Sequence, residues 1–262
     1  MDNEKIQDRM DRKQDKQREK TKRKTEEHSA FGGVFDSYTS INLNKMMAKG
    51  IIQEFVGIIS AGKEANVYFA LGEENIPLAV KIYKIDPQNT KWMKNYIIGD
   101  PRFKKIGTST HKIIYTWCKK ELKNLKQMER HGIIVPKPLI NRDNLLVMEF
   151  IGESNGSPAP RLKDVNHLED PKKTLDFVIN QIKKMYIEAH LVHGDLSAFN
   201  ILYFKGEPII IDVSQAVSVY HYNAPVFLKR DIINVLKYFE QFVSKSDLPD
   251  VNTLVQEILS ES

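Results

Sequence analysis

Hydrophobic residues in the first half of the chain gather in short runs that are rich in β-branched and aromatic side chains. Runs of this kind, bounded by glycine, asparagine or charged residues, predict β-strands. They lie at 51–59, 67–70, 78–83 and 145–151. Between the last two, apolar residues three or four positions apart predict a helix over about 112–131, with Gly132 behind it. A short helix is also expected to end at Gly50.

Helical spacing dominates the second half, which follows a stretch rich in glycine and proline at 152–160. This stretch predicts a boundary between two lobes. Beyond it, the pattern predicts a β-hairpin and three helices, near 172–190, 225–243 and 250–260. The predicted fold class is therefore α+β with two lobes, an N-terminal lobe over 31–151 and a C-terminal lobe over 152–262.

The composition allows a sizeable core and argues against membrane association. Of the 262 residues, 41% are hydrophobic, yet no apolar run approaches the length of a bilayer span. The charged N-terminus does not resemble a secretory signal. Cys118 is the single cysteine, which excludes an internal disulfide and fits a reducing compartment. We therefore expect a cytoplasmic protein without membrane contact, whereas the oligomeric state is not indicated.

The net charge of +5 is unevenly distributed. Residues 12–24 hold eight basic and two acidic side chains, and the tail around them is nearly devoid of apolar residues. Because such a segment cannot bury a face, we predict a charged, disordered tail over 1–30. A solvated tail is one interpretation, and a tail that binds nucleic acid or another acidic partner is the alternative.

One stretch of the second half carries an ordered set of chemically active side chains. Residues 193–200 read His-Gly-Asp-Leu-Ser-Ala-Phe-Asn, and Asp212 follows the predicted hairpin. Phosphoryl transfer from ATP needs a carboxylate near the acceptor hydroxyl and oxygen ligands for Mg²⁺. Asp195 fits the first role, and Asn200 and Asp212 fit the second, since the hairpin returns both to one end. A buried histidine with two turn-capping aspartates is the alternative, but three matches in order favour catalysis.

A lysine on the third predicted strand supplies the counterpart in the first lobe. Lys81 follows Ala-Val, a pattern in which the lysine neutralises nucleotide phosphates and a helix carboxylate holds it in place. Glu121 is the best candidate for that carboxylate, ahead of a second glutamate two turns further along. The preceding turn has one glycine, Gly62, so Ser60 and Lys63 are expected to help hold the phosphates. The alternatives are that Lys81 is an exposed strand lysine and that Glu121 forms a surface ion pair with a lysine one turn away on its own helix.

Four segments together resemble the Rio family of atypical serine/threonine protein kinases, in particular a short archaeal-type member of its first subfamily. They are residues 60–68, 99–103, 192–202 and 211–217, and the resemblance covers about residues 31–258. It implies a protein-kinase-like fold with a trimmed C-terminal lobe. It also implies ATP and Mg²⁺, or Mn²⁺ in its place, and kinase or ATPase activity in maturation of the small ribosomal subunit. The expected partners are a pre-ribosomal particle and its rRNA.

The resemblance assigns roles at single positions. Asp195 would accept the proton, Lys81 would hold the phosphates, and Asp212 would bind the metal with Asn200 and accept a phosphoryl group transiently. The base of ATP would meet five residues: Met148 as gatekeeper, the backbone of Glu149 and Ile151, and an apolar ceiling of Val67 and Ala79.

Two departures from ordinary protein kinases carry consequences. Val213 and Ser214 occupy the positions of the Phe-Gly pair whose movement switches the conformation of ordinary protein kinases, and no Ala-Pro-Glu sequence follows. Only 50 residues remain after Asp212, so the helices on which peptides dock have little chain to form from. Slow self-phosphorylation or ATP hydrolysis is therefore more plausible than peptide recognition.

The segment 86–110 is rich in polar and turn residues and is expected to be an irregular, flexible insertion. Loops of this length are usually functional lids or disordered connectors. We predict that it folds over the nucleotide and offers a self-phosphorylation site at Thr108, Ser109 or Thr110. The alternative is that one of these residues caps the following helix.

Two other functions remain open. A small-molecule phosphotransferase of the aminoglycoside or choline kinase type shares the His-Gly-Asp-Leu loop, although the residues after Gly152 are few for its larger second lobe. A ribonucleoprotein-binding module that uses ATP occupancy as a switch is motivated by the basic stretch 12–24.

Overall fold

The computed structural model describes residues 35–103 and 107–261, which fall into two units, Met1–Lys49 and Gly50–Ser262. The first unit contributes α2 (Ser37–Ala48), whose first turn is capped by the Asp36 carboxylate. The sequence predicts an N-terminal lobe that begins at residue 31 and would include α2. In the structure, α2 belongs to the first unit and the remaining elements belong to the second. The predicted tail over 1–30 lies outside the described residues.

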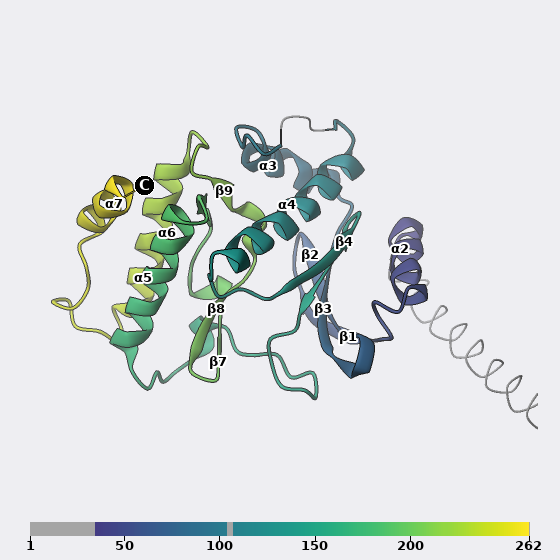
Figure 1. The fold of residues 1–262 in the computed structure, drawn as a ribbon, viewed down its shortest axis with the longest axis horizontal. Coiled ribbons are helices and arrows are strands. Elements are labelled where there is room, and N and C mark those ends of the chain that lie inside the picture. The colour runs from purple at the N-terminus through teal and green to yellow at the C-terminus, as the bar shows by residue number, and fades with distance from the viewer. Residues whose placement is uncertain (1–34, 104–106, 262) are drawn as a thin grey trace, which may run out of the picture. The chain divides into compact units, whose positions relative to one another are not determined.

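Five antiparallel strands form the main sheet of the second unit, in the order β1-β2-β3-β5-β4 (Figure 1). They are β1 (Glu54–Ala61), β2 (Ala65–Leu71), β3 (Pro77–Tyr83), β4 (Pro138–Arg142) and β5 (Leu145–Glu149). The register pairs Val67 with Lys81 and Ala79 with Met148. Because side chains alternate across a strand, these four side chains share one face of the sheet.

The helix α4 (Thr110–Arg130) connects the sheet to the helical half of the unit. Its buried residues recur at spacings of three and four, among them Ile113, Trp117 and Leu125. It packs against β4 and β5 on one side and against the turn η4 (Val213–Gln215) on the other (Figure 1). One rigid element therefore contacts segments from both halves of the predicted kinase-like fold.

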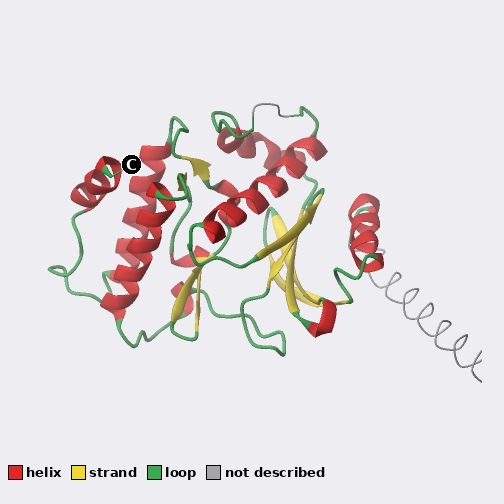
Figure 2. Ribbon diagram, viewed as in Figure 1, coloured by secondary structure: helices red, strands yellow, loops and turns green. Residues whose placement is uncertain are grey.

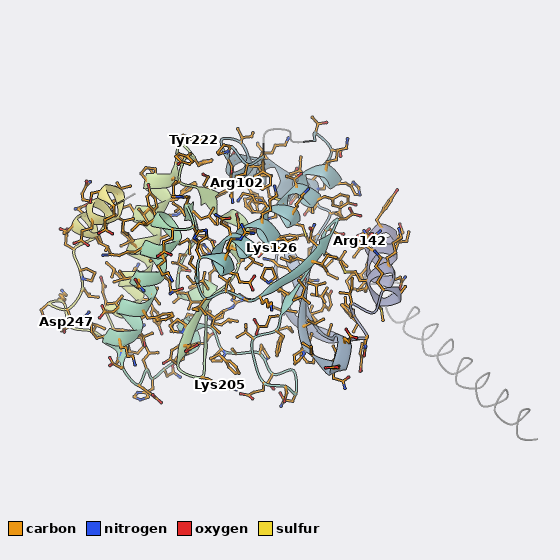
Figure 3. The ribbon with its side chains drawn as sticks, in the orientation of Figure 1. Arg102, Lys126, Arg142, Lys205, Tyr222 and Asp247 are labelled. Atoms are coloured by element: carbon orange, nitrogen blue, oxygen red, sulfur yellow. The ribbon has the colours of Figure 1, made fainter. Side chains whose placement is uncertain are left out.

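The second half of the unit is mainly helical (Figure 2). Its helices are α5 (Pro171–Ile187), α6 (Ala224–Phe239) and α7 (Val251–Ser260). Its strands are β6 (Leu191–Val192), β7 (Ile201–Phe204), β8 (Glu207–Ile210) and β9 (Val217–Ser218). Pairing of β7 with β8 forms the predicted hairpin, with Lys205 at its tip (Figure 3), and β6 pairs with β9. Short 3₁₀ turns lie at η1 (Glu73–Asn75), η2 (Leu162–Asp164) and η3 (Ala198–Asn200).

The α+β prediction is confirmed, but the expectation of irregular structure over 86–110 is wrong for Pro87–Ile97, which form α3. Proline is favourable in the first turn of a helix, and the Asp86 carboxylate caps this one through the Gln88 N–H. Buried Met93 and Ile97 anchor α3 in the core. The short strands β4, β6 and β9 were not predicted. Among the described helices, none combines the length and the apolar character needed to cross a bilayer.

Candidate active site

A cavity of about 520 Å³ opens along the sheet face that carries Lys81. Nine of the ten residues predicted to bind the nucleotide line it: Ser60, Gly62, Lys63, Val67, Ala79, Lys81, Met148, Glu149 and Ile151. Leu202 and Ile211 line it from the second half of the unit. Apolar side chains from two separate elements suit a planar base, because ligand sites are mostly apolar with few polar groups.

Lys81 is a buried lysine that forms ion pairs with two carboxylates. Its Nζ donates to Glu121 Oε1 at 2.7 Å and to Asp212 Oδ1 at 2.8 Å. Burial would lower the pKa of Lys81, but Asp212 and Glu121 together raise it above its usual value. Lys81 is therefore a cation held between two carboxylates. Glu121 does not line the cavity and acts on it only through this lysine.

Tyr83 completes the support of Lys81 from the same strand. Its hydroxyl donates to Glu121 Oε2, so both carboxylate oxygens of this buried side chain have partners. Burial raises the pKa of Glu121, whereas Lys81 opposes that rise. Removing the lysine would thus leave a carboxylate in the core with one neutral donor.

Asp212 is held in an uncommon backbone conformation, with φ 58° and ψ 53°. This left-handed region is costly for residues with a side chain, and aspartate tolerates it better than most. Ser214 Oγ donates to Asp212 Oδ1 at 3.2 Å, and the Asp212 side chain is 47% exposed. Partial removal from water would raise the pKa of Asp212, but the Lys81 ammonium holds that pKa below its usual value. Asp212 is an ionised carboxylate at the cavity wall.

His193 joins the two loops that carry the predicted catalytic residues. Its Nε2 donates to the Ile211 carbonyl at 3.1 Å, and its Nδ1 accepts from the Asp195 N–H at 3.3 Å. Burial lowers the pKa of His193 to about 4, so this imidazole is neutral at pH 7. The histidine therefore links the backbone of Asp195 to the backbone of Ile211, the residue before Asp212.

Asp231, on α6, fixes the backbone of the catalytic loop, residues 193–200. Its two carboxylate oxygens accept from the N–H groups of Gly194 and Leu196, both at 2.8 Å. Gly194 has φ 79°, a conformation that strongly favours glycine. The residues on both sides of Asp195 are thereby tied to one buried carboxylate.

Asp195 itself receives its side-chain hydrogen bonds from two neutral amides. Gln215 Nε2 donates to Asp195 Oδ2 at 3.1 Å, and Asn200 Nδ2 donates to the Asp195 carbonyl at 2.8 Å. Burial and the negative charge of Asp212 raise the pKa of Asp195, while the Arg230 guanidinium and the two amides oppose the rise. A raised pKa makes this carboxylate a better proton acceptor than an exposed one.

Asp212 and Asn200 together suit Mg²⁺. This ion takes oxygen ligands and is usually held by one or two carboxylates, with substrate phosphates and water completing its shell. The Asn200 amide nitrogen is directed at Asp195, which leaves the amide oxygen as the atom suited to a cation. Within the described residues, no group of three or more His, Cys, Asp or Glu side chains is placed to hold a metal ion.

The insertion that follows Lys81 lies elsewhere. No described residue of 86–110 lines the cavity. Trp92 meets Trp117 of α4 edge to face, with ring centroids 5.2 Å apart. Ser109 Oγ accepts from the Lys112 N–H at 3.4 Å and so caps α4, which was the alternative expected for Thr108, Ser109 and Thr110. The lid and the phosphorylation site remain predictions.

Three supporting residues were not identified from the sequence. Tyr83 ends the predicted strand 78–83, two positions after Lys81, and Gln215 lies in the segment 211–217, three positions after Asp212. The alternation of strand residues could have placed Tyr83 beside Lys81. Asp231 had no local signal, because its role depends on how α6 packs under the catalytic loop.

Comparison with known proteins identifies similar sequences over most of the chain. A family model described as the RIO domain matches residues 66–252. The RIO-type serine/threonine-protein kinase Rio1 of Haloferax volcanii is 41% identical over 214 residues, which cover 82% of this chain and 73% of that protein. Its Methanocaldococcus jannaschii counterpart is also 41% identical, covering 79% and 70%. The human serine/threonine-protein kinase RIO1 is 42% identical, covering 79% of this chain and 37% of its own length.

Solved structures show the same fold. The Rio2 kinase from Chaetomium thermophilum, crystallised as an ADP/Mg²⁺-phosphoaspartate complex, aligns with a TM-score of 0.63 at 21% identity. The alignment covers 83% of this chain and 65% of that one, slightly less than two thirds. A second structure of the same kinase gives a TM-score of 0.61 at 23% identity. At this identity the similarity establishes a protein-kinase-like architecture and no more.

Proposed function

The chain belongs to the RIO family of serine/threonine-protein kinases, and from this premise we propose that it transfers the γ-phosphoryl group of ATP to a hydroxyl. The single observation that carries the proposal is the cavity in which Lys81, Asn200 and Asp212 meet an apolar slot. The names of the relatives favour a protein kinase over the small-molecule phosphotransferase.

The chemistry follows from the two kinds of polar group. Lys81 binds phosphate oxygens and lowers the charge that repels an incoming nucleophile. Asp195 accepts the proton of the acceptor hydroxyl as its oxygen bonds to the γ-phosphorus, and ADP leaves with the electrons of the broken bond. Mg²⁺, or Mn²⁺ in its place, would be held by Asp212 and Asn200 and would neutralise charge on the phosphate oxygens.

Titration of the purified protein with ADP, with and without Mg²⁺, tests this proposal directly. We expect heat of binding in both cases and tighter binding with the metal. Incubation with ATP labelled at the γ-phosphate should then give labelled protein or free phosphate. If the protein gave neither binding heat nor release of label, the proposed function would be wrong.

We also propose that the acceptor can be the protein itself, including Asp212. The Asp212 carboxylate lines the cavity that would hold the triphosphate, and the related Rio2 kinase is described as a phosphoaspartate complex. A carboxylate oxygen would bond to the γ-phosphorus as ADP leaves, and water would later cleave the acyl phosphate, which amounts to ATP hydrolysis. Hydroxylamine should release phosphate from an acyl phosphate but leave a phosphoserine or phosphothreonine intact.

The cellular role that we propose is maturation of the small ribosomal subunit, in the cytoplasm. The resemblance to the first Rio subfamily and the basic stretch 12–24 support it. Counterion release makes binding of such a stretch to RNA strongly dependent on salt. Binding to small-subunit rRNA that weakens with salt and is lost on deletion of residues 1–28 would support this role. Binding unaffected by the deletion would remove the tail from it.

A further inference from the structure

Lys120, beside Glu121 on α4, is a buried lysine that the chemistry described above does not use. Its side chain has no measurable exposure. Its Nζ donates to the backbone carbonyl of Ser214 at 2.8 Å and to that of Ala216 at 2.5 Å. Both carbonyls belong to the turn that follows Asp212. The lysine thus reaches from the helix to the backbone of the predicted metal-binding segment.

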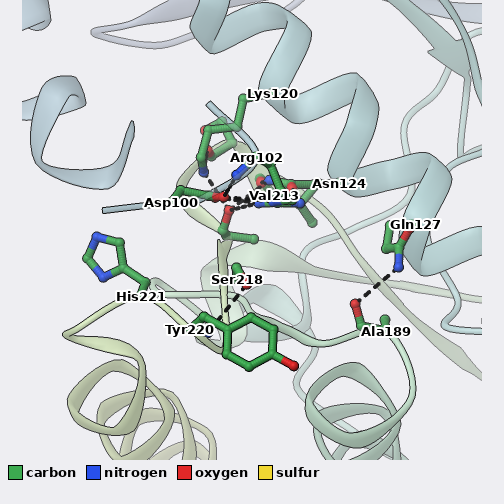
Figure 4. Close-up of polar contacts among 12 residues, drawn as sticks. Asp100, Arg102, Lys120, Asn124, Gln127, Ala189, Val213, Ser218, Tyr220 and His221 are labelled. Atoms are coloured by element: carbon green, nitrogen blue, oxygen red, sulfur yellow. Dashed lines mark hydrogen bonds and ion pairs between the residues drawn. The ribbon is translucent and has the colours of Figure 1, made fainter. Parts of the chain in front are cut away.

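Asn124, one helical turn further along α4, reaches the same segment. Its Nδ2 donates to the carbonyl of Val213 at 2.7 Å and to that of Ala216 at 2.9 Å. Figure 4 shows Lys120 and Asn124 near Val213, at the end of their contacts with this segment. Three of the four carbonyls that follow Asp212 are therefore bound by two side chains of one helix.

An ion pair from the insertion supports Asn124 in turn. Arg102 forms a two-point ion pair with the Asp100 carboxylate, at 2.9 and 2.6 Å (Figure 4). Arg102 Nη1 also donates to Asn124 Oδ1 at 2.8 Å. Because the Asn124 oxygen accepts from arginine, its amide nitrogen is directed toward the carbonyls. Every polar atom of the Asn124 side chain has a partner, as a buried amide requires.

Burial of a lysine against neutral partners is costly, which argues against an incidental arrangement. Lysine is almost never fully buried unless it is paired. Burial and the neighbouring Arg102 lower the pKa of Lys120 well below its usual value. A neutral amine still carries two N–H groups, the same number as the carbonyls that it meets here. The contacts are thus satisfied in either protonation state.

Residues of α4 hold Asp212 in two ways, through its side chain and through the backbone that follows it. From the side-chain direction, Asp212 binds Lys81, which Glu121 of α4 holds. From the backbone direction, the turn after Asp212 is bound by Lys120 and Asn124 of the same helix. The side chain of Asp212 and the backbone that follows it are therefore both held by residues of one helix, α4.

We propose that Lys120 is a positioning residue which, with Asn124, clamps the turn after Asp212 to α4 and keeps Asp212 ready for the metal before nucleotide binds. This clamp takes the place of the movable Phe-Gly pair that is missing after Asp212. The inference rests on the proposed function, since it assumes that Asp212 is a metal ligand.

Hydrogen exchange of the full-length wild-type protein tests the clamp without any substitution. Peptides that cover 213–217 should exchange slowly in the absence of nucleotide, and ADP with Mg²⁺ should change their rate by less than about threefold. Rapid exchange that slows more than tenfold only when ADP and Mg²⁺ are added would overturn the proposal, because the turn would then be formed by the ligand.

Lys120→Met tests the residue itself, with Lys119→Met as the matched control on the exposed face of the same helix. Calorimetry should measure ADP affinity with and without Mg²⁺. We expect Lys120→Met to reduce the gain in affinity from Mg²⁺ at least tenfold while metal-free ADP affinity stays within about twofold. Lys119→Met should match the wild type.

Two outcomes would contradict the proposal: an unchanged gain from Mg²⁺, or an equal loss of ADP affinity with and without it. Should Lys120→Met melt below the assay temperature, Asn124→Leu and the exchange result decide by the same criteria. A wild-type protein that shows no gain from Mg²⁺ would instead count against the proposed function, so the two failures are distinguishable.

Discussion

The two halves of the candidate active site hold their carboxylates by different means. In the nucleotide half, Asp212 is paired with the ammonium of Lys81. In the acceptor half, Asp195 receives hydrogen bonds from the neutral amides of Gln215 and Asn200. The pKa of Asp212 is accordingly lowered and that of Asp195 raised. Two aspartates on neighbouring loops thus acquire opposite tendencies from their surroundings alone.

This difference matches the two tasks that we propose for Asp212 and Asp195. A metal ligand must remain ionised, which a buried cation ensures. A proton acceptor should bind its proton neither too weakly nor too tightly, which neutral donors and partial burial provide. The same residue type can therefore serve both roles, and the contrast gives separate ways to disable each half.

The largest effect is expected from removing the acceptor-half carboxylate. Asp195→Ala should reduce phosphoryl transfer by about 10³-fold, within the range typical of a positioned general base. ADP affinity should stay within about twofold, because Asp195 does not line the nucleotide cavity. Single-turnover transfer and calorimetry measure the two quantities. Undiminished turnover would mean that the role of Asp195 is wrongly assigned.

Lys81→Met should instead damage the nucleotide half and the fold together. It leaves Glu121 buried with only the Tyr83 hydroxyl as partner, and breaking a buried ion pair in this way costs about 3 kcal/mol or more. Denaturant unfolding measures the loss, and nucleotide affinity should fall as well. Lys119→Met, on the exposed face of α4, is the control.

The sign of the pH dependence sharpens this test. Burial raises the pKa of Glu121 in the folded protein, and loss of Lys81 should raise it further. A carboxyl with a raised folded-state pKa destabilises the protein at a pH above its unfolded value, and the penalty disappears as it becomes protonated. The stability deficit of Lys81→Met should therefore shrink as the pH falls. A deficit that grows with acidity would contradict the assignment of Glu121 as the unpaired group.

Residues whose partners follow a fixed spacing could be predicted from the sequence, whereas those set by packing could not. Asp195, Asn200 and the hairpin before Asp212 form one local unit, and Lys81 lies on a strand with a readable pattern. Glu121 was found because helix position limits the candidates. Asp231 lies 36 residues after Asp195, at a distance that no local rule fixes.

The difference between local spacing and tertiary packing also explains why the sequence did not predict α3, β6 and β9. The proline and asparagines of α3 are typical of turns, although proline at the first position is compatible with a helix. What stabilises α3 is the burial of Met93 and Ile97 against other elements, a tertiary effect. The two-residue strands β6 and β9 are too short to leave a pattern.

Gln215→Leu should have a smaller effect, confined to the acceptor half. It removes an N–H donor from Asp195 Oδ2 and should raise the pKa of Asp195 further. Because the base must be ionised, the acid limb of the pH–rate profile should move to higher pH. Well above that limb, the rate should stay within about threefold of the wild type. Gln241→Leu, which removes a surface amide, is the matched control. An equal loss of rate at every pH would indicate a merely structural role.

The smallest effect is expected from Ser109→Ala, outside both halves. The Ser109 hydroxyl caps α4, so its loss should lower the free energy of unfolding by about 1 kcal/mol. Phosphoryl transfer to Asp212 or water should not change, since Ser109 does not line the cavity.

Mass spectrometry after incubation with ATP measures phosphate at 108–110. If phosphate appears there and disappears with Asp195→Ala, this segment is an acceptor that reaches the acceptor half. Phosphate found only elsewhere would leave Ser109 as a helix cap.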